Sequence, residues 1–454
     1  MLDLLIIGGR LLDFKRGLVE ENLGIKDGKI SYMGVDFPQA KEVLELEAQI
    51  VSPGFIDIHM HEEDFVLSQG DYDIAKTMLA MGVTTAVAGN CGNNRQSLEA
   101  FLSQLNSSGS PINYMSYIGH NFLREQVGNR DTKAPSTREQ TQKMRSLVNE
   151  AINLGALGIS YGFEYCSGGS FEEAIGIAED LKGKEGILLT GHYRYDGDRA
   201  LESIQEMAEI SKALDLPFLI SHLSSCSAFG YMKESLDLIR DYREKGVKLF
   251  VDAYPYTAFS TYIGSDVFEE GCLERWGVDY KDIQLTQAPY ENTRCTEEIF
   301  MDARKNHPKM LAIAHVMREE EIAMAMADPM VIVASDGIYS SGKGHPRGAG
   351  TFPRFISKYL RDEGLMEFVE GMKKITLMPA ETLGLSNKGR LEEGCDADLC
   401  IFNYSEIRDQ ADFAEAQKPP LGISHVLIDG KFALRDGTST EGRFGKFIAR
   451  KNGS

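Results

Sequence analysis

The chain has 454 residues and a formal net charge of −20, from 48 Lys and Arg against 68 Asp and Glu. So large an excess of negative charge disfavours binding to nucleic acid or to anionic membrane surfaces. Hydrophobic residues make up 43% and charged residues 26% of the chain, which is typical of a globular protein and excludes extended disorder.

Neither the apolar segments nor the cysteines indicate a membrane or secreted protein. No apolar run approaches the roughly 18 residues that a membrane span needs. The first residues, Met1-Leu2-Asp3-Leu4, lack the basic start of a signal peptide. The seven cysteines are sparse, odd in number and without a CxxC pair, so a disulfide framework is not expected. We therefore expect a soluble cytoplasmic protein in which any functional cysteine acts as a thiolate.

The central part of the chain alternates helix and strand patterns. Residues 2–51 alternate short apolar runs with Gly and Asp turns, which predicts a small sheet of hairpins. From Pro53 onward, helically spaced apolar residues alternate with short strand-like runs. Eight such runs occur, at 54–58, 83–87, 112–118, 157–161, 187–190, 218–221, 247–251 and 331–335. This pattern predicts an α/β fold, a (β/α)8 TIM-like barrel, although a doubly wound open sheet would alternate likewise.

Two parts of the chain depart from this alternation. Residues 266–310 are acidic, Cys-containing and Pro-flanked without a clear period, which predicts an insertion, and the apolar run 310–314 behind it is a candidate for a ninth strand. Residues 390–433 return to short strands. We therefore expect a small β-sandwich domain built from both chain ends, 1–52 and 386–454, beside a barrel domain at 53–385.

Two histidines follow the first predicted barrel strand, in the segment Gly54-Phe-Ile-Asp-Ile-His-Met-His61. Residues two apart in a strand face the same side, so the imidazoles of His59 and His61 point one way at the end of the strand where barrel enzymes carry catalytic groups. Such a pair suits two metal ligands, but it can equally be two hydrogen-bonded surface histidines.

Four further candidate ligands also stand directly after predicted strands. Cys91 follows the second strand, His192 the fifth, His222 the sixth and Asp336 the eighth. The chain has only nine histidines, so chance placement of four of them at strand ends is improbable, and the pattern favours a metal site. Thiolate, imidazole and carboxylate together suit zinc, which would deprotonate Cys91.

A zinc site of this kind predicts a hydrolase. Zinc with three protein ligands keeps one open position and lowers the pKa of water there to about 7, which supplies a hydroxide for attack on an amide carbonyl. Asp336 can take the proton as water attacks and return it to the departing amine, which contributes a factor of about 10²–10⁴ in rate. The alternative for Asp336 is a turn or N-cap aspartate before Gly337.

Several motifs, taken together, resemble a known family. They are Ser52-Pro-Gly-Phe-Ile-Asp-Ile-His-Met-His61, Gly89-Asn-Cys-Gly92, Gly191-His-Tyr-Arg194, Ser221-His222, Asp252-Ala-Tyr-Pro-Tyr-Thr257, Ser335-Asp-Gly337, His345-Pro-Arg-Gly348, Gly350-Thr-Phe-Pro-Arg354 and Lys388-Gly-Arg-Leu-Glu-Glu-Gly394. They cover nearly the whole length, and the chain resembles the amidohydrolase superfamily and, within it, the N-acyl-D-amino-acid deacylase (D-aminoacylase) group. The HxH and terminal motifs are specific for the superfamily, and the Cys91 and His-Pro-Arg motifs for the subgroup.

The resemblance implies a zinc-dependent hydrolase that cleaves an N-acyl-D-amino acid, or a related linear N-acyl compound, into a carboxylate and a free amino acid. The implied metal ligands are His59, His61, Cys91, His192, His222 and Asp336. Among them, Cys91, His192 and His222 hold one zinc tightly, and the two histidines of the HxH motif form a weaker second site. Asp336 is also the implied catalytic aspartate.

The resemblance also implies a substrate-binding arginine. Arg347 lies eleven residues beyond Asp336, in a glycine-rich stretch that permits close approach of a ligand. A guanidinium can bind a carboxylate through two parallel hydrogen bonds, which suits an N-acyl amino acid, whereas the alternative is a solvated arginine in a flexible loop. The resemblance assigns the carboxylate to Arg347 and implies that Tyr254 and Ser260 assist it.

Two positions depart from the family pattern. Ser224 stands two residues past the sixth-strand histidine, where the family usually has a lysine that helps to hold the carboxylate. Glu164 stands near the end of the fourth strand, where the group normally continues through a Pro-Gly segment. We interpret Glu164 as a surface carboxylate, with a metal ligand or a substrate contact as the alternatives. These changes bear on the natural substrate more than on the type of reaction.

Two other functions compete with this hypothesis. A cyclic amidohydrolase of the hydantoinase or dihydroorotase kind resembles the chain in the HxH pair and the eighth-strand aspartate, but it bridges two metals with a modified lysine on the fourth strand. No lysine occurs between Leu157 and Cys166. A non-catalytic amidohydrolase-like protein predicts a missing ligand, and none is missing. We therefore expect a small-molecule substrate, without a nucleic-acid or membrane partner; the oligomeric state is not predicted.

Overall fold

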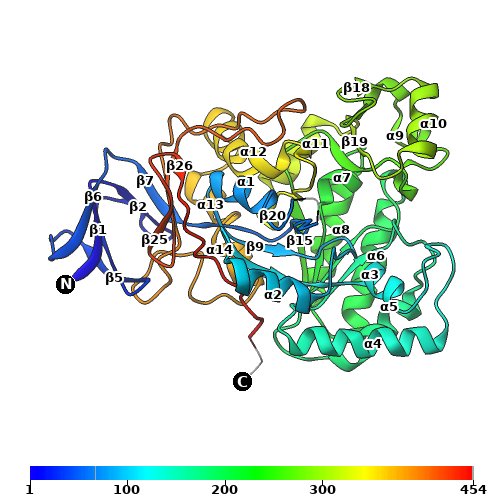
Figure 1. Ribbon diagram of the computed structural model, residues 1–454, viewed down its shortest axis with the longest axis horizontal. Helices are drawn as coiled ribbons and strands as arrows, with labels where there is room; N and C mark the ends of the chain where they lie inside the picture. The colour runs from blue at the N-terminus through cyan, green and yellow to red at the C-terminus, as the bar shows by residue number, and fades with distance from the viewer. Residues whose placement is uncertain (67, 452–454) are drawn as a thin grey trace.

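The computed structural model describes residues 1–66 and 68–451, and parallel strands form its centre (Figure 1). One parallel sheet has the order β10-β9-β8, with the bounds Asn113–Ser116, Val83–Ala88 and Phe55–Asp57. A second has the order β11-β12-β13-β14-β15-β20, with the bounds Ile118–Gly119, Ile159–Gly162, Leu189–His192, Phe218–Ile220, Leu249–Ala253 and Val331–Val333. Each of the eight predicted strand runs overlaps one of these strands, and the predicted α/β class is confirmed.

Hydrogen bonds join the two parallel sheets at both of their open edges. Only Tyr117 separates β10 from β11, and its N–H donates to a carbonyl of β9 (3.0 Å). At the opposite edges, the His61 N–H donates to the carbonyl of Gly337 (3.1 Å) and the Asp336 N–H donates to that of His59 (2.8 Å). The carboxyl ends of β8 and β20 are therefore neighbours, and segments almost 280 residues apart in sequence meet there.

Helices alternate with the parallel strands along the chain. They are α1 (Ile74–Ala80), α2 (Leu98–Ser108), α3 (His120–Gln126), α4 (Arg138–Asn153), α5 (Phe171–Ala178), α6 (Ala200–Leu214), α7 (Leu223–Ser227), α8 (Met232–Glu244), α11 (Glu319–Ala327), α12 (Arg347–Arg354), α13 (Phe368–Lys373) and α14 (Leu377–Thr382). The α4 helix shows why they form: Thr137 and Gln140 make a capping box at its start, and Met144 and Val148 are buried on one face.

The chain ends form two further sheets, one from the N-terminal end alone and one from both ends (Figure 1). One has the order β5-β4-β1-β6, with the bounds Lys29–Gly34, Asn22–Lys26, Leu2–Ile7 and Ala40–Glu45. The other has the order β26-β25-β24-β23-β7-β2-β3, with the bounds Thr438–Ser439, Lys431–Arg435, Ile423–Ile428, Leu399–Phe402, Ile50–Pro53, Arg10–Asp13 and Gly17–Val19. Leu4, Leu23, Val51, Leu399 and Leu427 share one buried apolar cluster, so residues from both ends of the chain pack together.

The chain makes a long excursion between β15 and β20. Strands β16 (Phe259–Tyr262), β19 (Leu311–Ala314), β17 (Ile283–Leu285) and β18 (Thr293–Arg294) form an antiparallel sheet in that order, accompanied by α9 (Cys272–Trp276) and α10 (Glu297–Asn306). The predicted ninth strand is β19, and it pairs with β16 and β17 instead of the central strands. The excursion begins at the carboxyl end of β15, which is the end of the sheet where the candidate ligands lie.

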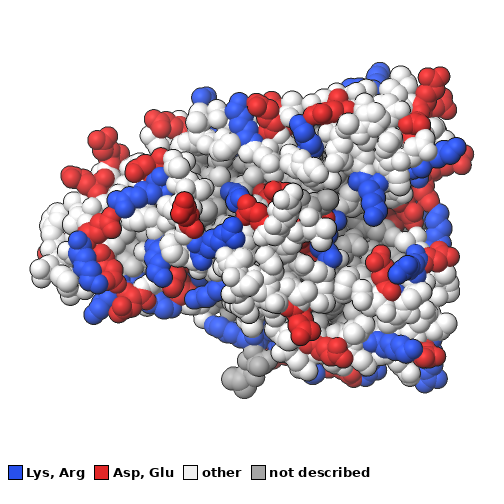
Figure 2. Space-filling model, in the orientation of Figure 1, with Lys and Arg blue, Asp and Glu red and all other residues white. Residues whose placement is uncertain are grey.

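The outer surface carries charges of both signs. On the face drawn in Figure 2, acidic and basic side chains are intermingled and not separated into large patches of one sign. Among the described residues, no helix combines the length and the apolar character that a membrane crossing requires.

A buried charge cluster connects the C-terminal sheet to the central strands. The Asp398 carboxylate accepts hydrogen bonds from Lys388 Nζ (2.5 Å), from Asn113 Nδ2 of β10 (3.0 Å) and from the Asp429 N–H (2.8 Å). The Lys388 and Asp398 side chains are only 5% and 6% exposed. Each charge is therefore neutralised by the other, and loss of one partner leaves the other buried without compensation.

We expect Lys388→Met to lower the free energy of unfolding by about 3–5 kcal/mol, because it strands the Asp398 carboxylate in the interior. The control is Lys41→Met, since Lys41 pairs with Asp3 on the surface with 62% of its side chain exposed and such a pair contributes little to stability. Urea unfolding followed by circular dichroism compares the two variants. An equal loss of stability in both would contradict the assignment.

Candidate active site

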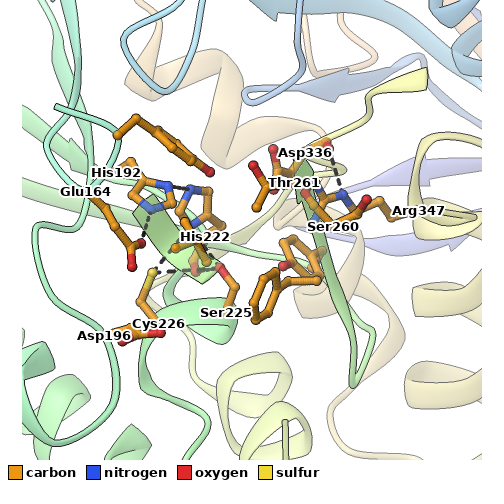
Figure 3. Close-up of a pocket in the computed structure, with 14 residues that line it drawn as sticks. Glu164, His192, Asp196, His222, Ser225, Cys226, Ser260, Thr261, Asp336 and Arg347 are labelled. Atoms are coloured by element: carbon orange, nitrogen blue, oxygen red, sulfur yellow. Dashed lines mark hydrogen bonds and ion pairs between the residues drawn. The ribbon is translucent and has the colours of Figure 1, made fainter. Parts of the chain in front are cut away.

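Six of the sequence-predicted site residues converge at the carboxyl ends of the parallel strands. His59 and His61 follow β8, Cys91 follows β9, His192 ends β13, His222 follows β14 and Asp336 follows β20. All are buried except His61, whose side chain is 16% exposed. Figure 3 shows His192 and His222 on one side of the pocket and Asp336 with Arg347 on the other.

Three of these residues have left-handed backbone conformations. The φ angles of Cys91, His222 and Asp336 are +54°, +34° and +51°. Residues other than glycine seldom adopt such angles, and each costs about 1–3 kcal/mol, which the surrounding structure must supply. All three lie where the chain leaves a strand, so the strain accompanies the sharp turns that aim these side chains into the pocket. Strain of this kind is concentrated at functional sites in proteins.

The donor atoms form two groups that share Cys91. One group contains His59, His61, Cys91 and Asp336, and the other contains Cys91, His192 and His222; within each group the donor atoms lie within 4.8 Å of one another. Cys91 Sγ is 3.4 Å from Nε2 of His59 and 3.4 Å from Nε2 of His222. Tetrahedral zinc with ordinary Zn–N and Zn–S bonds separates N from S by about 3.5 Å. The donor set therefore fits a metal ion in type and in spacing.

Three of the four histidines, His59, His192 and His222, have a second polar contact on the ring nitrogen that faces away from Cys91. Asp252 Oδ2 lies 3.1 Å from His59 Nδ1, and Glu164 Oε2 lies 2.8 Å from His192 Nε2. The Ser225 hydroxyl lies 3.0 Å from His222 Nδ1. A carboxylate or hydroxyl on the outer nitrogen fixes the tautomer and the orientation of a ligating imidazole.

The electrostatics of the site favour ionised Cys91 and Asp336. Burial by itself would raise the pKa of Cys91, but the neighbouring His59 and His222 outweigh it and hold the pKa well below its usual value. Burial likewise opposes ionisation of Asp336, but Arg347 and His61 hold its pKa well below the usual value for aspartate. A thiolate and a carboxylate are both metal ligands in their ionised forms.

The structure corrects the interpretation of Glu164 as a surface carboxylate. Its side chain is only 10% exposed, lines the pocket and contacts His192. The Glu164 N–H donates to the carbonyl of Tyr193 (2.9 Å), which holds the turn after β12 against β13 and points the carboxylate inward. The sequence alone also gave no role to Asp252, although its carboxylate contacts His59 and accepts the His222 N–H (2.7 Å). Its only signal was its place at the end of a predicted strand.

Arg347 lies beside Asp336 and is not a solvated loop residue. It begins α12 and is 1% exposed. Its Nη2 is 2.9 Å from Asp336 Oδ2, and its Nε donates to the carbonyl of Asp336 (2.7 Å). The Arg347 Cζ atom lies 4.8 Å from the centre of the Tyr254 ring, and Nη2 donates to the carbonyl of Ser260 (3.1 Å). The structure therefore brings all three predicted substrate-binding residues together around the aspartate.

The Tyr254 and Ser260 hydroxyls line the pocket beside Arg347. Both are buried, and neither hydroxyl has a hydrogen-bond partner among the described residues. A buried hydroxyl without a partner costs free energy, which a bound ligand that supplies an acceptor would recover. These two groups and Arg347 therefore form a wall of hydrogen-bond donors.

The pocket has a narrow inner part and a wide outer part. The inner part is a cavity of about 20 Å³ that contains Glu164, His192, His222 and Asp336 among its lining residues. The outer cavity has about 730 Å³ and is bordered by His61 and by residues of the excursion. Both are lined by Tyr165, Ser260, Thr261, Asp336 and Arg347. A ligand can therefore enter through the wide part and place a small group beside the candidate metal ligands.

Comparisons with known proteins show which family the chain resembles. A sequence model of the amidohydrolase family matches residues 281–433. The D-aminoacylase of Alcaligenes xylosoxydans xylosoxydans is 28% identical over 482 residues, covering 99% of this chain and 98% of the relative. A crystal structure of D-aminoacylase, 26% identical, superposes with a TM-score of 0.88 and covers 99% of this chain and 100% of that one. The chain therefore resembles the D-aminoacylase group of the amidohydrolases over nearly its whole length.

Other members of the D-aminoacylase group also match over almost the full length. The N-acyl-D-glutamate deacylase of the same Alcaligenes organism is 28% identical and covers 94% of this chain and 93% of its own. The structure of N-acyl-D-glutamate deacylase from Bordetella bronchiseptica, solved with zinc and a phosphonate mimic of the tetrahedral intermediate, has 25% identity and a TM-score of 0.86, covering 99% of this chain and 100% of that one. L-Hydantoinase from Arthrobacter aurescens, at 16% identity and a TM-score of 0.66, shares the fold.

Two features of the pocket bear on the expectations drawn from the sequence. The β12 strand carries no lysine that could bridge two metals, and Cys91 lies between the two donor groups instead. Ser224 occupies the position at which the resemblance predicts a lysine, and its buried hydroxyl accepts the N–H of Tyr254 (3.3 Å). The pocket therefore lacks that positive charge.

We expect Cys91→Ala to reduce bound zinc to well under half of the wild-type content per chain, because it removes the donor that the two groups share. The control is Cys295→Ala, which removes a buried cysteine of the excursion that does not belong to either donor group. Zinc is measured by mass spectrometry of the metal in protein freed of loosely bound ions. Equal zinc in the Cys91 variant and the wild type would show that Cys91 is not a ligand.

Proposed function

We propose that this protein hydrolyses the amide bond of an N-acyl-D-amino acid and releases a carboxylate and a free D-amino acid. The observation that carries the proposal is the placement of Asp336 between a buried metal-donor set and the wall formed by Arg347, Tyr254 and Ser260. Its relatives are a D-aminoacylase and deacylases of N-acyl-D-aspartate and N-acyl-D-glutamate. A hydrolase of this class acts on carbon-nitrogen bonds other than peptide bonds.

We also propose how the protein is divided and which metal it holds. The eight parallel segments would form one (β/α)8 barrel within residues 53–385, and residues 1–52 with 386–454 would form a β-sandwich domain. Zinc would bind tightly to Cys91, His192 and His222, with a weaker second site at His59, His61 and Asp336. When bound, zinc polarises a carbonyl and supplies hydroxide at neutral pH. Zinc in the Bordetella deacylase structure supports this choice of metal.

The donor wall would bind the substrate carboxylate. Arg347 offers a guanidinium with several N–H groups, of which Nε and Nη2 contact Asp336 and the carbonyl of Ser260. A substrate carboxylate that approaches Tyr254 and Ser260 would accept hydrogen bonds from their unpaired hydroxyls and from the guanidinium. The amino-acid side of the scissile amide is then fixed relative to Asp336, which lowers the entropy cost of reaching the transition state.

Asp336 would accept the proton of the attacking water and deliver it to the departing amine. In the free protein, Arg347 and His61 hold the pKa of Asp336 well below its usual value despite burial, so the carboxylate is ionised but weakly basic. A substrate carboxylate that shares the Arg347 guanidinium weakens this stabilisation. Substrate binding would therefore raise the proton affinity of Asp336 at the moment when a base is required.

We expect Asp336→Asn to lower kcat for an N-acetyl-D-amino acid by about 10²–10⁴-fold, because an amide cannot accept the proton. Zinc bound by the other donor group, to which Asp336 does not belong, should remain. The assay screens the zinc-loaded wild type and variant against N-acetyl and N-formyl D- and L-amino acids, hydantoins and dihydroorotate. Unchanged turnover in the variant would remove Asp336 from the mechanism, and turnover of the cyclic compounds alone would favour the cyclic amidohydrolase function.

Asp252 should act by holding His59. We expect Asp252→Asn to weaken zinc binding at the proposed second site, which contains His59, by about 10–100-fold, because the carboxylate that orients the imidazole loses its charge. Competition with a chromophoric chelator measures the affinity. The matched control is Asp237→Asn, a surface carboxylate that pairs only with Lys233 and Arg240 and that should leave the affinity unchanged. Equal affinities in the wild type and both variants would contradict a positioning role.

A further inference from the structure

The inner pocket has an acidic wall to which the proposed reaction assigns no contact with the substrate. Glu164 and Asp196 both line it, with side chains that are 10% and 4% exposed. They follow the neighbouring strands β12 and β13, which explains why they lie close together. In Figure 3 they lie with His192 and Cys226 on one side of the pocket, and Arg347 with Ser260 lies on the other.

Protein groups neutralise this wall only in part. Arg275 contacts both carboxylates, with Nε 2.5 Å from Asp196 Oδ1 and Nη2 3.8 Å from Glu164 Oε1. Trp276 Nε1 donates to Asp196 Oδ2 (2.6 Å) without adding charge. Arg194, two residues after the end of β13, is bound to Glu206 instead. Glu164 Oε2 also lies 2.8 Å from His192 Nε2, but an imidazole that binds a metal is neutral. With a metal bound, the two carboxylates would therefore share one guanidinium, and an uncompensated negative charge in such a place costs free energy.

The two walls together match a ligand with charges of opposite sign at its two ends. Arg347, Tyr254 and Ser260 offer donors on one side, and Glu164 and Asp196 offer acceptors on the other. The candidate metal ligands His192 and His222 line the same small space. The scissile carbonyl would therefore lie between an anion-binding and a cation-binding wall.

The distances limit where the positive charge of the ligand can be. Glu164 Oε2 is 2.8 Å from His192 Nε2, so one imidazole ring separates this carboxylate from the candidate metal position. The inner cavity has only about 20 Å³, which is space for one or two water-sized groups because one such group needs about 10–15 Å³. A cation that reaches the acidic wall must therefore be small and close to the scissile carbonyl. A long basic side chain does not fit.

We propose that the preferred substrates carry a primary ammonium group on the carbon next to the scissile carbonyl, so that the acyl half is an aminoacyl group. Glu164 and Asp196 would bind this ammonium while Arg347 binds the carboxylate of the D-amino acid. This inference rests on the proposed amide hydrolysis and names its substrate class. Water adds to the carbonyl carbon, the C–N bond breaks, and the departing amine takes the proton that water loses. Two free amino acids are the products, and the bond that breaks is a peptide bond to a D-amino acid, so this inference extends the proposed activity beyond amides of simple acyl groups.

Two pairs of substrates of equal shape test the proposal. Glycyl-D-alanine and N-propionyl-D-alanine differ only by an ammonium in place of a methyl group on the acyl half. N-Acetyl-D-2,3-diaminopropionate and N-acetyl-D-2-aminobutyrate differ in the same way on the amino-acid side chain. We expect the zinc-loaded enzyme to show at least about tenfold higher kcat/KM for the glycyl than for the propionyl compound, which is the effect of one hydrogen bond to a charged group. The second pair should show no such preference.

Variants then connect the preference to the acidic wall. Glu164→Gln and Asp196→Asn should each reduce the ratio of kcat/KM for the glycyl compound to that for the propionyl compound. The control is Glu206→Gln, which alters a carboxylate that is bound to Arg194 and lies outside the pocket lining. This variant should leave the ratio unchanged. The ratio separates recognition from damage, because misfolding or zinc loss lowers both rates alike. The Asp196 carboxylate contacts Trp276 and Arg275, which are not candidate metal ligands. If Glu164→Gln loses zinc, Asp196→Asn alone therefore tests whether the acidic wall binds the ammonium group.

The outcomes distinguish the two levels of the argument. Equal or faster hydrolysis of the propionyl compound by the wild type overturns the aminoacyl assignment while the proposed deacylase function stands. A preference confined to the diaminopropionate pair places the cation on the side chain and also overturns it. Hydrolysis of none of the four compounds, together with hydrolysis of hydantoins or dihydroorotate, overturns the proposed function itself.

Discussion

The Cys91 thiolate, shared between two sets of imidazoles, is the interaction on which the rest of the site depends. A buried anion is costly unless positive charge surrounds it, and here His59 and His222 each lie 3.4 Å from the sulfur. These histidines come from β8 and β14, which are not adjacent in either sheet. Cys91 can reach both only because the carboxyl ends of the strands converge. The chemistry of the site is therefore inseparable from the arrangement of the strands.

The backbone supports this convergence at a cost. Cys91, His222 and Asp336 all have positive φ angles, although glycine would adopt such angles without strain. Glycine cannot supply a thiolate, an imidazole or a carboxylate, so function determines the residue type at these turns. The next residue, Gly92, leaves no room for a side chain, because a Cβ atom there would lie 2.6 Å from the N atom of Gly162. The Cys91 turn is thus packed directly against the end of β12.

How far the sequence could predict the site depends on the range of the interactions. The spacing of His59 and His61 follows from the two-residue period of a strand, and residues that directly follow apolar strands meet at one edge of parallel sheets. These local rules sufficed to predict every member of the two donor groups. The contact of Glu164 with His192 and that of Asp252 with His59 join different strands. Such contacts depend on the order and tilt of the strands, which hydrophobic periodicity does not encode.

Hydrophobic periodicity was equally unable to predict how the strands of the excursion between β15 and β20 pair. The apolar run 310–314 has the character of a buried strand, and β19 is buried along its whole length. Periodicity could not reveal that its partners are β16 and β17, since strand pairing is decided by the turns and the apolar faces of distant segments. The consequence for function is considerable, because β16 carries Ser260 and Thr261 into the pocket. The excursion thus supplies one wall of the cavity, through a strand whose pairing with β19 the sequence did not predict.

In the proposed mechanism, Arg347 takes part both in binding the substrate carboxylate and in setting the basicity of Asp336. It contacts the carboxylate and the carbonyl of Asp336, and it borders the hydroxyls of Tyr254 and Ser260 that await a partner. An anion bound at those hydroxyls competes with Asp336 for the same positive charge, so the proton affinity of the aspartate rises only when that anion is present. A ligand without a carboxylate would leave Asp336 ionised and weakly basic. In the proposed mechanism, catalysis would therefore depend on the carboxylate that Arg347, Tyr254 and Ser260 bind.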